Sequence, residues 1–277
     1  MKQALQSILG VLLLPVLAAG AMVPPAQAQD AEALIDQVMT GSQRSDANKA
    51  RDKYRHPKET LLFFGLKPNM TVVEITPGAG WYTEILAPVM RGGVYYAAIF
   101  QMTEKSSETQ RTNDRNFRAK LAGDADRYGK VQLSVLAPNA IQVAPAGSAD
   151  MVLTFRNVHN WAKAGTADAM FKAFYDALKP GGILGVKDHR AKPDTPFETQ
   201  IESGYMTEVW VIETAQKAGF KLESKSDINA NPKDTADYPG GVWTLPPTLR
   251  DVPEAEKPKY LAIGESDRMT LKFAKPR

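Results

Sequence analysis

An alternation of apolar runs with helical stretches, from residue 70 to residue 274, constrains the fold of this chain more than any other feature. The first run, 70–76, is continuous and rich in β-branched residues, which is typical of a strand buried on both faces. Strands that alternate with helices of this length form βαβ units and a mainly parallel sheet. The expected strands are 70–76, 94–100, 131–136, 150–155, 183–187, 221–226 and 269–274, and the expected helices among them are 81–90, 106–121, 166–178 and 206–218.

Residues 1–28 are predicted to be a cleaved signal peptide that takes no part in the fold. Lys2 gives a positive start, an apolar run covers 8–21, and Ala26-Gln27-Ala28 is a small-x-small cleavage signature. The run is shorter than the roughly 20 apolar residues that span a bilayer; the alternatives are an uncleaved anchor or a buried helix. We expect export, with the periplasm favoured, a mature chain that begins near Gln29, and no stable membrane insertion after cleavage.

Charge and cysteine content narrow the class of function. The net charge is +3, and because Lys2 is the one charged residue in 1–28, the remainder carries 3 − 1 = +2. So balanced a charge gives no reason to expect a nucleic acid as partner. Residues 29–277 suffice for one domain with its own core. The sequence has no cysteine, which excludes disulfides, thiolate metal sites and cysteine nucleophiles.

The first expected strand runs through a glycine turn directly into a helix. The turn is Pro77-Gly78-Ala79-Gly80, and the helix follows from Trp81. Glycine lets the backbone approach a ligand closely, and the first N–H groups of a helix have no partner within it. Such a turn lies at the carboxyl edge of the sheet, where doubly wound folds bind ligands. Thr83 occupies the third glycine position of a dinucleotide fingerprint, so phosphate binding is the less favoured interpretation.

This segment, with Glu74 inside the strand four residues before Gly78, resembles motif I of class I S-adenosylmethionine-dependent methyltransferases. Further segments resemble later parts of that family in the same order, and together they extend the resemblance over about 58–276. More narrowly, two segments resemble a group of exported bacterial proteins described as predicted methyltransferases. The segments that resemble the superfamily are 149–155, 177–184, 218–220 and 269–273, and those that resemble the exported group are 80–84 and 155–161.

The resemblance implies a Rossmann-like, doubly wound α/β fold. Its sheet would be seven-stranded and mostly parallel, with an antiparallel last strand. It also implies S-adenosylmethionine as cofactor and a small molecule as substrate. The family's acid at the end of the second strand is replaced here, where Gln101 stands, and Asn139 follows the third strand. The expected cofactor-binding residues are Glu74, Pro77, Gly78, Ala79, Gly80, Trp81, Gln101 and Asn139.

Two histidines and an aspartate follow the expected fourth and fifth strands. His159 comes after the fourth, and Asp188 and His189 come at the end of the fifth, so all three belong at the carboxyl edge of the sheet. Histidine suits proton transfer near neutral pH. We expect a catalytic role for these three, with His159 or Asp188 as the base. With His56 they would make a nitrogen-and-oxygen metal site, and the third interpretation is hydrogen-bonded structural histidines.

The segment 231–267 is rich in proline and aromatic residues and shows little periodicity. A long irregular stretch in a compact domain is commonly a functional lid or a packed surface excursion, and a protein-docking surface is a further interpretation. The leading hypothesis for the chain is a methyltransferase of an unknown small molecule. The alternative is a non-catalytic periplasmic ligand-binding protein on the same scaffold.

Overall fold

The computed structural model describes residues 31–137 and 140–277. Its strands form one seven-stranded sheet in the order β3-β2-β1-β4-β5-β7-β6. Strands β1 to β5 pair in parallel, whereas β7 is antiparallel to both of its neighbours. The doubly wound sheet with an antiparallel last strand is therefore confirmed. The strands are β1 (Thr71–Ile75), β2 (Val94–Phe100), β3 (Gln132–Leu136), β4 (Ala149–Phe155), β5 (Leu178–His189), β6 (Lys221–Ser226) and β7 (Arg268–Ala274).

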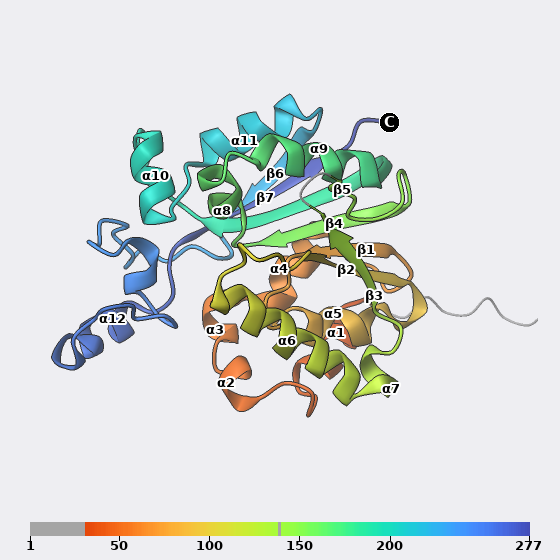
Figure 1. Cartoon of the computed structure of the whole chain (residues 1–277), viewed down its shortest axis with the longest axis horizontal. Helices are drawn as coiled ribbons and strands as arrows, with labels where there is room; N and C mark the ends of the chain where they lie inside the picture. Colours follow the sequence, from red (N-terminus) through yellow and green to blue (C-terminus); the bar gives the residue numbers. More distant parts are fainter. Residues whose placement is uncertain (1–30, 138–139) are drawn as a thin grey trace, which may run out of the picture.

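Helices cover both faces of the sheet (Figure 1). One face carries α1 (Ala31–Met39), α4 (Pro57–Phe64), α5 (Thr83–Val89), α6 (Glu108–Gly123) and α7 (Ala125–Tyr128), with the short α2 (Asp46–Lys49) and α3 (Asp52–Arg55) beside them. The other face carries α8 (Val158–Lys163), α9 (Ala167–Ala177) and α11 (Glu208–Lys217), while α10 (Phe197–Ser203) and α12 (Lys257–Ile263) lie beyond the strand ends. No helix in residues 31–137 and 140–277 is long and apolar enough to cross a membrane.

The core has two layers because successive side chains of a strand point to opposite faces. In β1, Val73 packs in the layer with Phe171 and Phe174 of α9. Its neighbour Val72 packs in the other layer with Leu61 of α4. The continuous apolar run in the sequence thus reflects a strand covered by helices on both sides.

The fifth strand is longer than expected. The expected strand is 183–187 and follows an expected helix over 166–178, but residues 179–182 also lie within β5, which begins at Leu178. The N–H of Gly181 donates to the carbonyl of Lys275 at 2.9 Å, and the N–H of Lys275 donates to Gly182 at 2.9 Å. The last residues of the chain therefore hold this glycine pair in the sheet, which local sequence does not indicate.

The segment 231–267 is packed onto the domain. It contains the 3-10 helices η2 (Gly241–Thr244) and η3 (Glu254–Glu256) in addition to α12. The carboxylate of Asp234 accepts hydrogen bonds from the hydroxyl of Tyr205 at 3.0 Å and from the N–H of Asp267 at 2.7 Å. A Cβ on Gly241, where φ is +60°, would lie 2.3 Å from the carbonyl oxygen of Ser203. This close contact with the end of α10 makes the segment a fixed wall of the structure.

Candidate functional site

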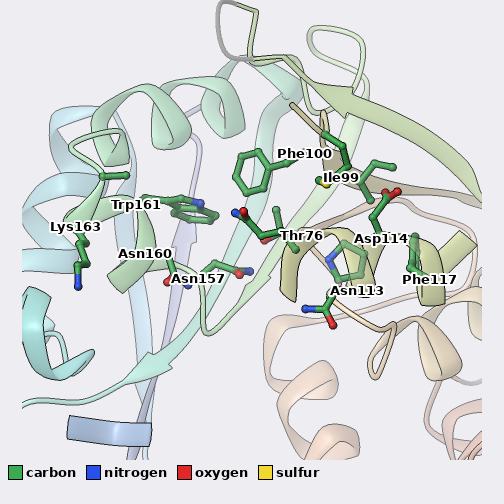
Figure 2. Close-up of a pocket in the computed structure, with 15 residues that line it drawn as sticks. Thr76, Ile99, Phe100, Asn113, Asp114, Phe117, Asn157, Asn160, Trp161 and Lys163 are labelled. Carbon is green, nitrogen blue, oxygen red and sulfur yellow. The ribbon is translucent and has the colours of Figure 1, made fainter. Parts of the chain in front are cut away.

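A cavity of about 520 Å³ opens at the carboxyl edge of the sheet, above β1 and β2. Figure 2 shows Trp161, Asn157 and Lys163 on one side of it and Asp114 and Phe117 on the other. Its polar lining consists mainly of amide and hydroxyl groups, and its apolar lining comes from the end of β2 and from α8. The lining residues are Thr76, Pro77, Gly78, Ile99, Phe100, Met102, Gln110, Asn113, Asp114, Phe117, Asn157, Asn160, Trp161, Lys163 and Ala164.

The two glycines of the turn after β1 differ in what surrounds their backbone. Both have left-handed backbone conformations, with φ of +61° at Gly78 and +83° at Gly80. A Cβ on Gly78 would meet nothing within 4 Å, so this part of the backbone faces open space. A Cβ on Gly80 would lie 3.1 Å from the ring of Phe117. Gly78 therefore exposes the backbone to the cavity, whereas Gly80 lets α6 pack closely over the turn.

One face of α6 forms a wall of the cavity that sequence reasoning missed. Gln110, Asn113, Asp114 and Phe117 all line it, and their spacing of three, four and seven residues places them on one helix face. The helix starts in a capping box, in which Ser107 and Gln110 bond each other's backbone N–H groups. The spacing of these residues can be seen in the sequence. It points to the cavity only once the structure shows that α6 packs over the glycine turn.

The first two residues of the predicted cofactor turn line the cavity, but Glu74 is turned away from it. Pro77 and Gly78 are among the lining residues. Glu74 is 2 % exposed, and its carboxylate accepts hydrogen bonds from Thr83 at 2.8 Å and from the Tyr95 hydroxyl. Burial raises the pKa of Glu74 to about 7, against the effect of these hydroxyls. Glu74 therefore ties β1 to α5 and β2 from inside the core.

The other predicted cofactor residues lie outside the lining of this cavity. Trp81 faces the N-terminal helices, where its ring packs against Arg44 and Arg55 and its N–H donates to the carbonyl of Asn48 at 3.3 Å. Ala79 is exposed, as is Gln101, whose backbone N–H continues the pairing with β3. Gly80 lies under Phe117 as described, and Asn139 lies outside the described residues.

The structure brings His159, Asp188 and His189 together. Their ligand-type atoms all lie within 4.8 Å of one another. Asp188 is fully buried, and its carboxylate accepts bonds from the backbone N–H groups of His159 at 3.1 Å and His189 at 2.8 Å. His159 Nδ1 lies 2.9 Å from the same carboxylate. Because an ionised carboxylate only accepts, Nδ1 carries a proton and donates it to this hydrogen bond, which leaves Nε2 as the ring nitrogen outside it.

The charges around this cluster oppose a metal cation. Burial, followed by His159, Arg268, Arg156 and Arg55, holds the pKa of His189 well below its usual range. The arginines that disfavour a proton on His189 also disfavour a metal cation there. His56, the fourth member of the predicted metal set, sits between α3 and α4 and is not among the clustered groups of the described residues.

A second cavity of about 410 Å³ lies beside the histidine cluster. His159 of α8 lines it, and the segment 231–267 supplies the opposite wall through Trp243 and Arg250. The Arg250 guanidinium lies over the Trp243 ring, 4.8 Å from its centroid. Asn160 and Lys163 line both this cavity and the first one. The turn of α8 that carries them therefore separates two adjoining chambers.

A larger hollow of about 670 Å³ lies along Arg190 and the start of α11, and its arginine is paired with acidic side chains. Arg190 forms ion pairs with Asp267 at 2.8 Å, Asp227 at 2.8 Å and Glu208 at 3.1 Å. The charge of Arg190 is therefore offset within the fold. We therefore place the candidate site in the two chambers beside α8.

No protein-family model and no curated protein matches the sequence, whereas many solved structures match the fold. A S-adenosylmethionine-dependent methyltransferase from Aquifex aeolicus aligns with a TM-score of 0.53 at 16% identity, covering 88% of this chain and 98% of that one. A phosphoethanolamine N-methyltransferase of Haemonchus contortus aligns with a TM-score of 0.51 at 15% identity over 88% and 61%. The fold is that of class I methyltransferases.

The methyltransferase fold does not by itself give the reaction. The cyclase SpnF, described as a 4+2 cyclase, aligns with a TM-score of 0.56 at 15% identity, covering 88% of this chain and 92% of that one. One architecture thus supports different chemistry in different chains. The function of this chain has to be argued from its own cavities and side chains.

Proposed function

We propose that this chain is an S-adenosylmethionine-dependent methyltransferase acting on a small molecule. The observation that carries the proposal is the cavity at Gly78, where an open backbone turn follows the first strand of a methyltransferase fold. Ligands of doubly wound folds bind at this edge of the sheet. The 520 Å³ volume is within the usual range of small-molecule pockets, roughly 300 to 1,000 Å³.

The residues of the cavity fit the cofactor. The hydroxyl oxygen of Thr76 is buried and has no hydrogen-bond partner among the described residues, and Thr76 lines the cavity at φ of +46°. A buried hydroxyl without a partner is uncommon, and a polar ligand would satisfy it. Asn113 and Asp114 offer acceptors for ribose hydroxyls from α6, in place of the acid that is missing at the end of β2. Phe100 and Trp161 offer apolar surface to a purine.

The second chamber is proposed to hold the methyl acceptor, with His159 as its base. The cofactor, when bound, supplies an electrophilic methyl group, and the chain has to align a nucleophile and remove one proton. Asp188 holds the Nδ1 proton of His159 at 2.9 Å, so Nε2 is the nitrogen that accepts the proton. His189, kept neutral by burial and its cationic neighbours, packs against His159 with ring centroids 5.2 Å apart.

Export belongs to the same proposal. The apolar stretch 8–21 followed by Ala26-Gln27-Ala28 favours cleavage after residue 28 and a periplasmic mature protein. Expression in a Gram-negative host, followed by fractionation and intact-mass measurement, tests this. A periplasmic protein whose mass matches residues 29–277 supports the proposal, and a full-length protein in the cytoplasm contradicts it.

Calorimetric titration with S-adenosylmethionine and S-adenosylhomocysteine tests cofactor binding. We expect micromolar affinity, reduced about tenfold in Asn113→Ala, because one hydrogen bond to a buried polar group is worth about 1 to 1.5 kcal/mol. Asn116→Ala is the matched control, since Asn116 lies on the exposed side of α6. Equal affinity in the two variants would place the cofactor elsewhere.

The titration also separates the proposal from its alternative. Absence of binding to either nucleoside by folded protein contradicts the methyltransferase. A different small molecule that co-purifies and occupies the first cavity, with no methyl transfer, would support the non-catalytic ligand-binding protein. Binding followed by transfer that His159→Gln lowers by about two to four orders of magnitude would establish the enzyme and its base.

A further inference from the structure

A third, much smaller pocket of about 40 Å³ lies on the other side of the turn after β1. Thr76 and Pro77 line both this pocket and the first cavity. Arg55 and Arg156 line the small pocket from α3 and from the residue after β4. We call it the arginine pocket, and its full lining is Arg55, Glu74, Ile75, Thr76, Pro77, Trp81, Tyr82, Phe155 and Arg156.

Positive charge gathers around the arginine pocket in excess of negative charge. Arg55, Lys187 and Arg268 are 3 %, 2 % and 1 % exposed, and Arg51 and Arg156 lie within their electrostatic reach. Glu265 is the carboxylate that these arginines share: it accepts bonds from Arg51 at 2.6 Å, from Arg55 at 2.9 Å and from Arg268. A buried charge costs several kcal/mol unless it is paired, so a further anion would be strongly favoured here.

Several guanidinium nitrogens in this group have no partner. One terminal nitrogen of Arg55, one of Arg51 and the Nε of Arg268 are buried without a hydrogen bond to any described residue. The Arg156 guanidinium likewise makes no hydrogen bond or ion pair within residues 31–137 and 140–277. Burial and the neighbouring Arg268 lower the pKa of Arg156 to about 10. Unsatisfied buried donors are rare in folded proteins. The free nitrogen of Arg55 and the unpaired guanidinium of Arg156, both from residues that line the pocket, therefore indicate a missing acceptor there.

Arg55 is held in place for such an acceptor. Its Nε donates to Glu265 at 2.9 Å, and its guanidinium carbon lies over the Trp81 ring, 4.7 Å from the centroid. Tyr82 and Phe155 stack with centroids 3.6 Å apart and form another wall of the pocket. A guanidinium fixed along one edge and one face keeps its remaining N–H groups oriented, which is the arrangement that binds planar carboxylates most effectively.

We infer that the arginine pocket binds the carboxylate group of a small-molecule ligand. The volume admits one group of a few atoms, and the shared Thr76–Pro77 wall places the remainder of that ligand at the first cavity or the acceptor chamber. The carboxylate belongs either to the methyl acceptor or to the amino-acid end of the cofactor. The second source rests on the proposed function, whereas the pocket itself does not.

Thermal unfolding in sodium formate against sodium chloride, at equal ionic strength, tests the pocket without a cofactor. We expect about 100 mM formate to raise the melting temperature of the chain by about 2 to 4 °C, and Arg156→Gln to lose this shift. Arg115→Gln removes an equal charge from an exposed side chain of α6 and should keep the shift. Arg156→Lys retains the positive charge but lacks the planar pair of guanidinium N–H groups, so it should keep only part of the shift in melting temperature.

Two outcomes of the formate experiment, in addition to one stability result, would overturn the inference. One is the absence of a formate-specific shift in the unsubstituted chain. The other is an equal shift in Arg156→Gln, which would mean that formate binds elsewhere. Arg156→Gln should itself melt no lower than the unsubstituted chain without formate, because it relieves repulsion among buried cations; marked destabilisation would assign Arg156 a structural role and contradict the inference.

Titration of Arg156→Gln with two nucleosides then identifies the source of the carboxylate. S-adenosylhomocysteine carries an amino-acid end, and methylthioadenosine lacks it. A loss of about tenfold for the first nucleoside alone assigns the carboxylate to the cofactor. Unchanged affinity for both, with the formate shift lost, assigns it to another ligand. If neither nucleoside binds and the formate shift still depends on Arg156, the cofactor proposal fails while the arginine pocket stands.

Discussion

The first cavity and the arginine pocket lie on opposite sides of Thr76 and Pro77, and they are built in opposite ways. The first is wide and lined by amides and apolar groups, which come from residues 76 to 164 of the chain. The second is narrow and is lined by residues 55 to 156, but the cations that act on its arginines come from distant parts of the chain, from α3 to Arg268 of β7. A wide pocket can therefore arise from consecutive βα units, whereas the charged one requires the end of the chain to pack against its beginning.

Two buried carboxyl groups show the same contrast. Glu74 and Glu265 are each 2 % exposed. Burial raises the pKa of Glu74 to about 7, and the hydrogen bonds from the hydroxyls of Tyr95 and Thr83 offset this effect only in part. Burial acts in the same direction on Glu265, but the arginines 268, 55 and 51 outweigh it and hold its pKa far below the usual range. Equal burial thus accompanies pKa shifts in opposite directions, and the neighbouring charge decides the direction.

The largest expected effect is that of Glu265→Gln. It leaves Arg51, Arg55 and Arg268 without their shared anion, and breaking a buried pair in this way costs about 3 to 5 kcal/mol. Urea unfolding at pH 7 should show this loss, while Glu254→Gln, an exposed control, should lie within about 0.5 kcal/mol of the unsubstituted chain.

The pH dependence of that loss has a definite sign. A carboxyl with a lowered folded pKa stabilises the fold above its unfolded pKa of 4.5 and loses this contribution as the pH falls. The difference between Glu265→Gln and the unsubstituted chain should therefore shrink below about pH 4.5. A difference that does not change with pH would show that Glu265 acts through packing alone.

Glu74 should contribute a pH dependence of stability opposite in sign to that of Glu265, and Glu74→Gln should remove it. A carboxyl with a folded pKa of about 7 and an unfolded pKa of 4.5 contributes stability that is complete below 4.5 and is lost as the pH rises through 7. The free energy of unfolding of the unsubstituted chain should fall by up to about 3 kcal/mol between pH 5 and pH 8. Each pH unit between the unfolded and the folded pKa of a carboxyl changes this free energy by about 1.36 kcal/mol. Urea unfolding of Glu74→Gln should lack this slope, and parallel slopes in both proteins would mean that Glu74 stays ionised.

The smallest expected effects separate the two glycines of the turn. Gly78→Ala and Gly80→Ala both place a side chain at positive φ, at a cost of about 1 to 2 kcal/mol. Gly80→Ala should cost about 1 kcal/mol more, since its Cβ would approach Phe117 to 3.1 Å. Gly78→Ala should weaken binding of S-adenosylhomocysteine instead. Equal unfolding free energies would show that α6 shifts freely to make room.

Residues whose role follows from the backbone were predictable. Pro77 and Gly78 line the cavity because a glycine turn after a buried strand has to lie at the carboxyl edge of the sheet. Asp188 and His159 meet because their strands are neighbours in that sheet. Trp81 was less predictable, since its direction depends on whether Arg44 and Arg55 or a ligand offers the better contact. That choice is made by residues 26 and 37 positions earlier in the chain.

The sequence by itself determined the order of strands and helices, the glycine turn and the placement of histidines at strand ends, because periodicity and backbone freedom are local properties. Tertiary structure decided that α6 closes the first cavity and that Glu74 faces the core. It also decided that Arg51, Arg55 and Arg268 surround one carboxylate, that of Glu265. Those outcomes depend on long-range packing and on charges that meet only after folding, and no local pattern in the chain records them.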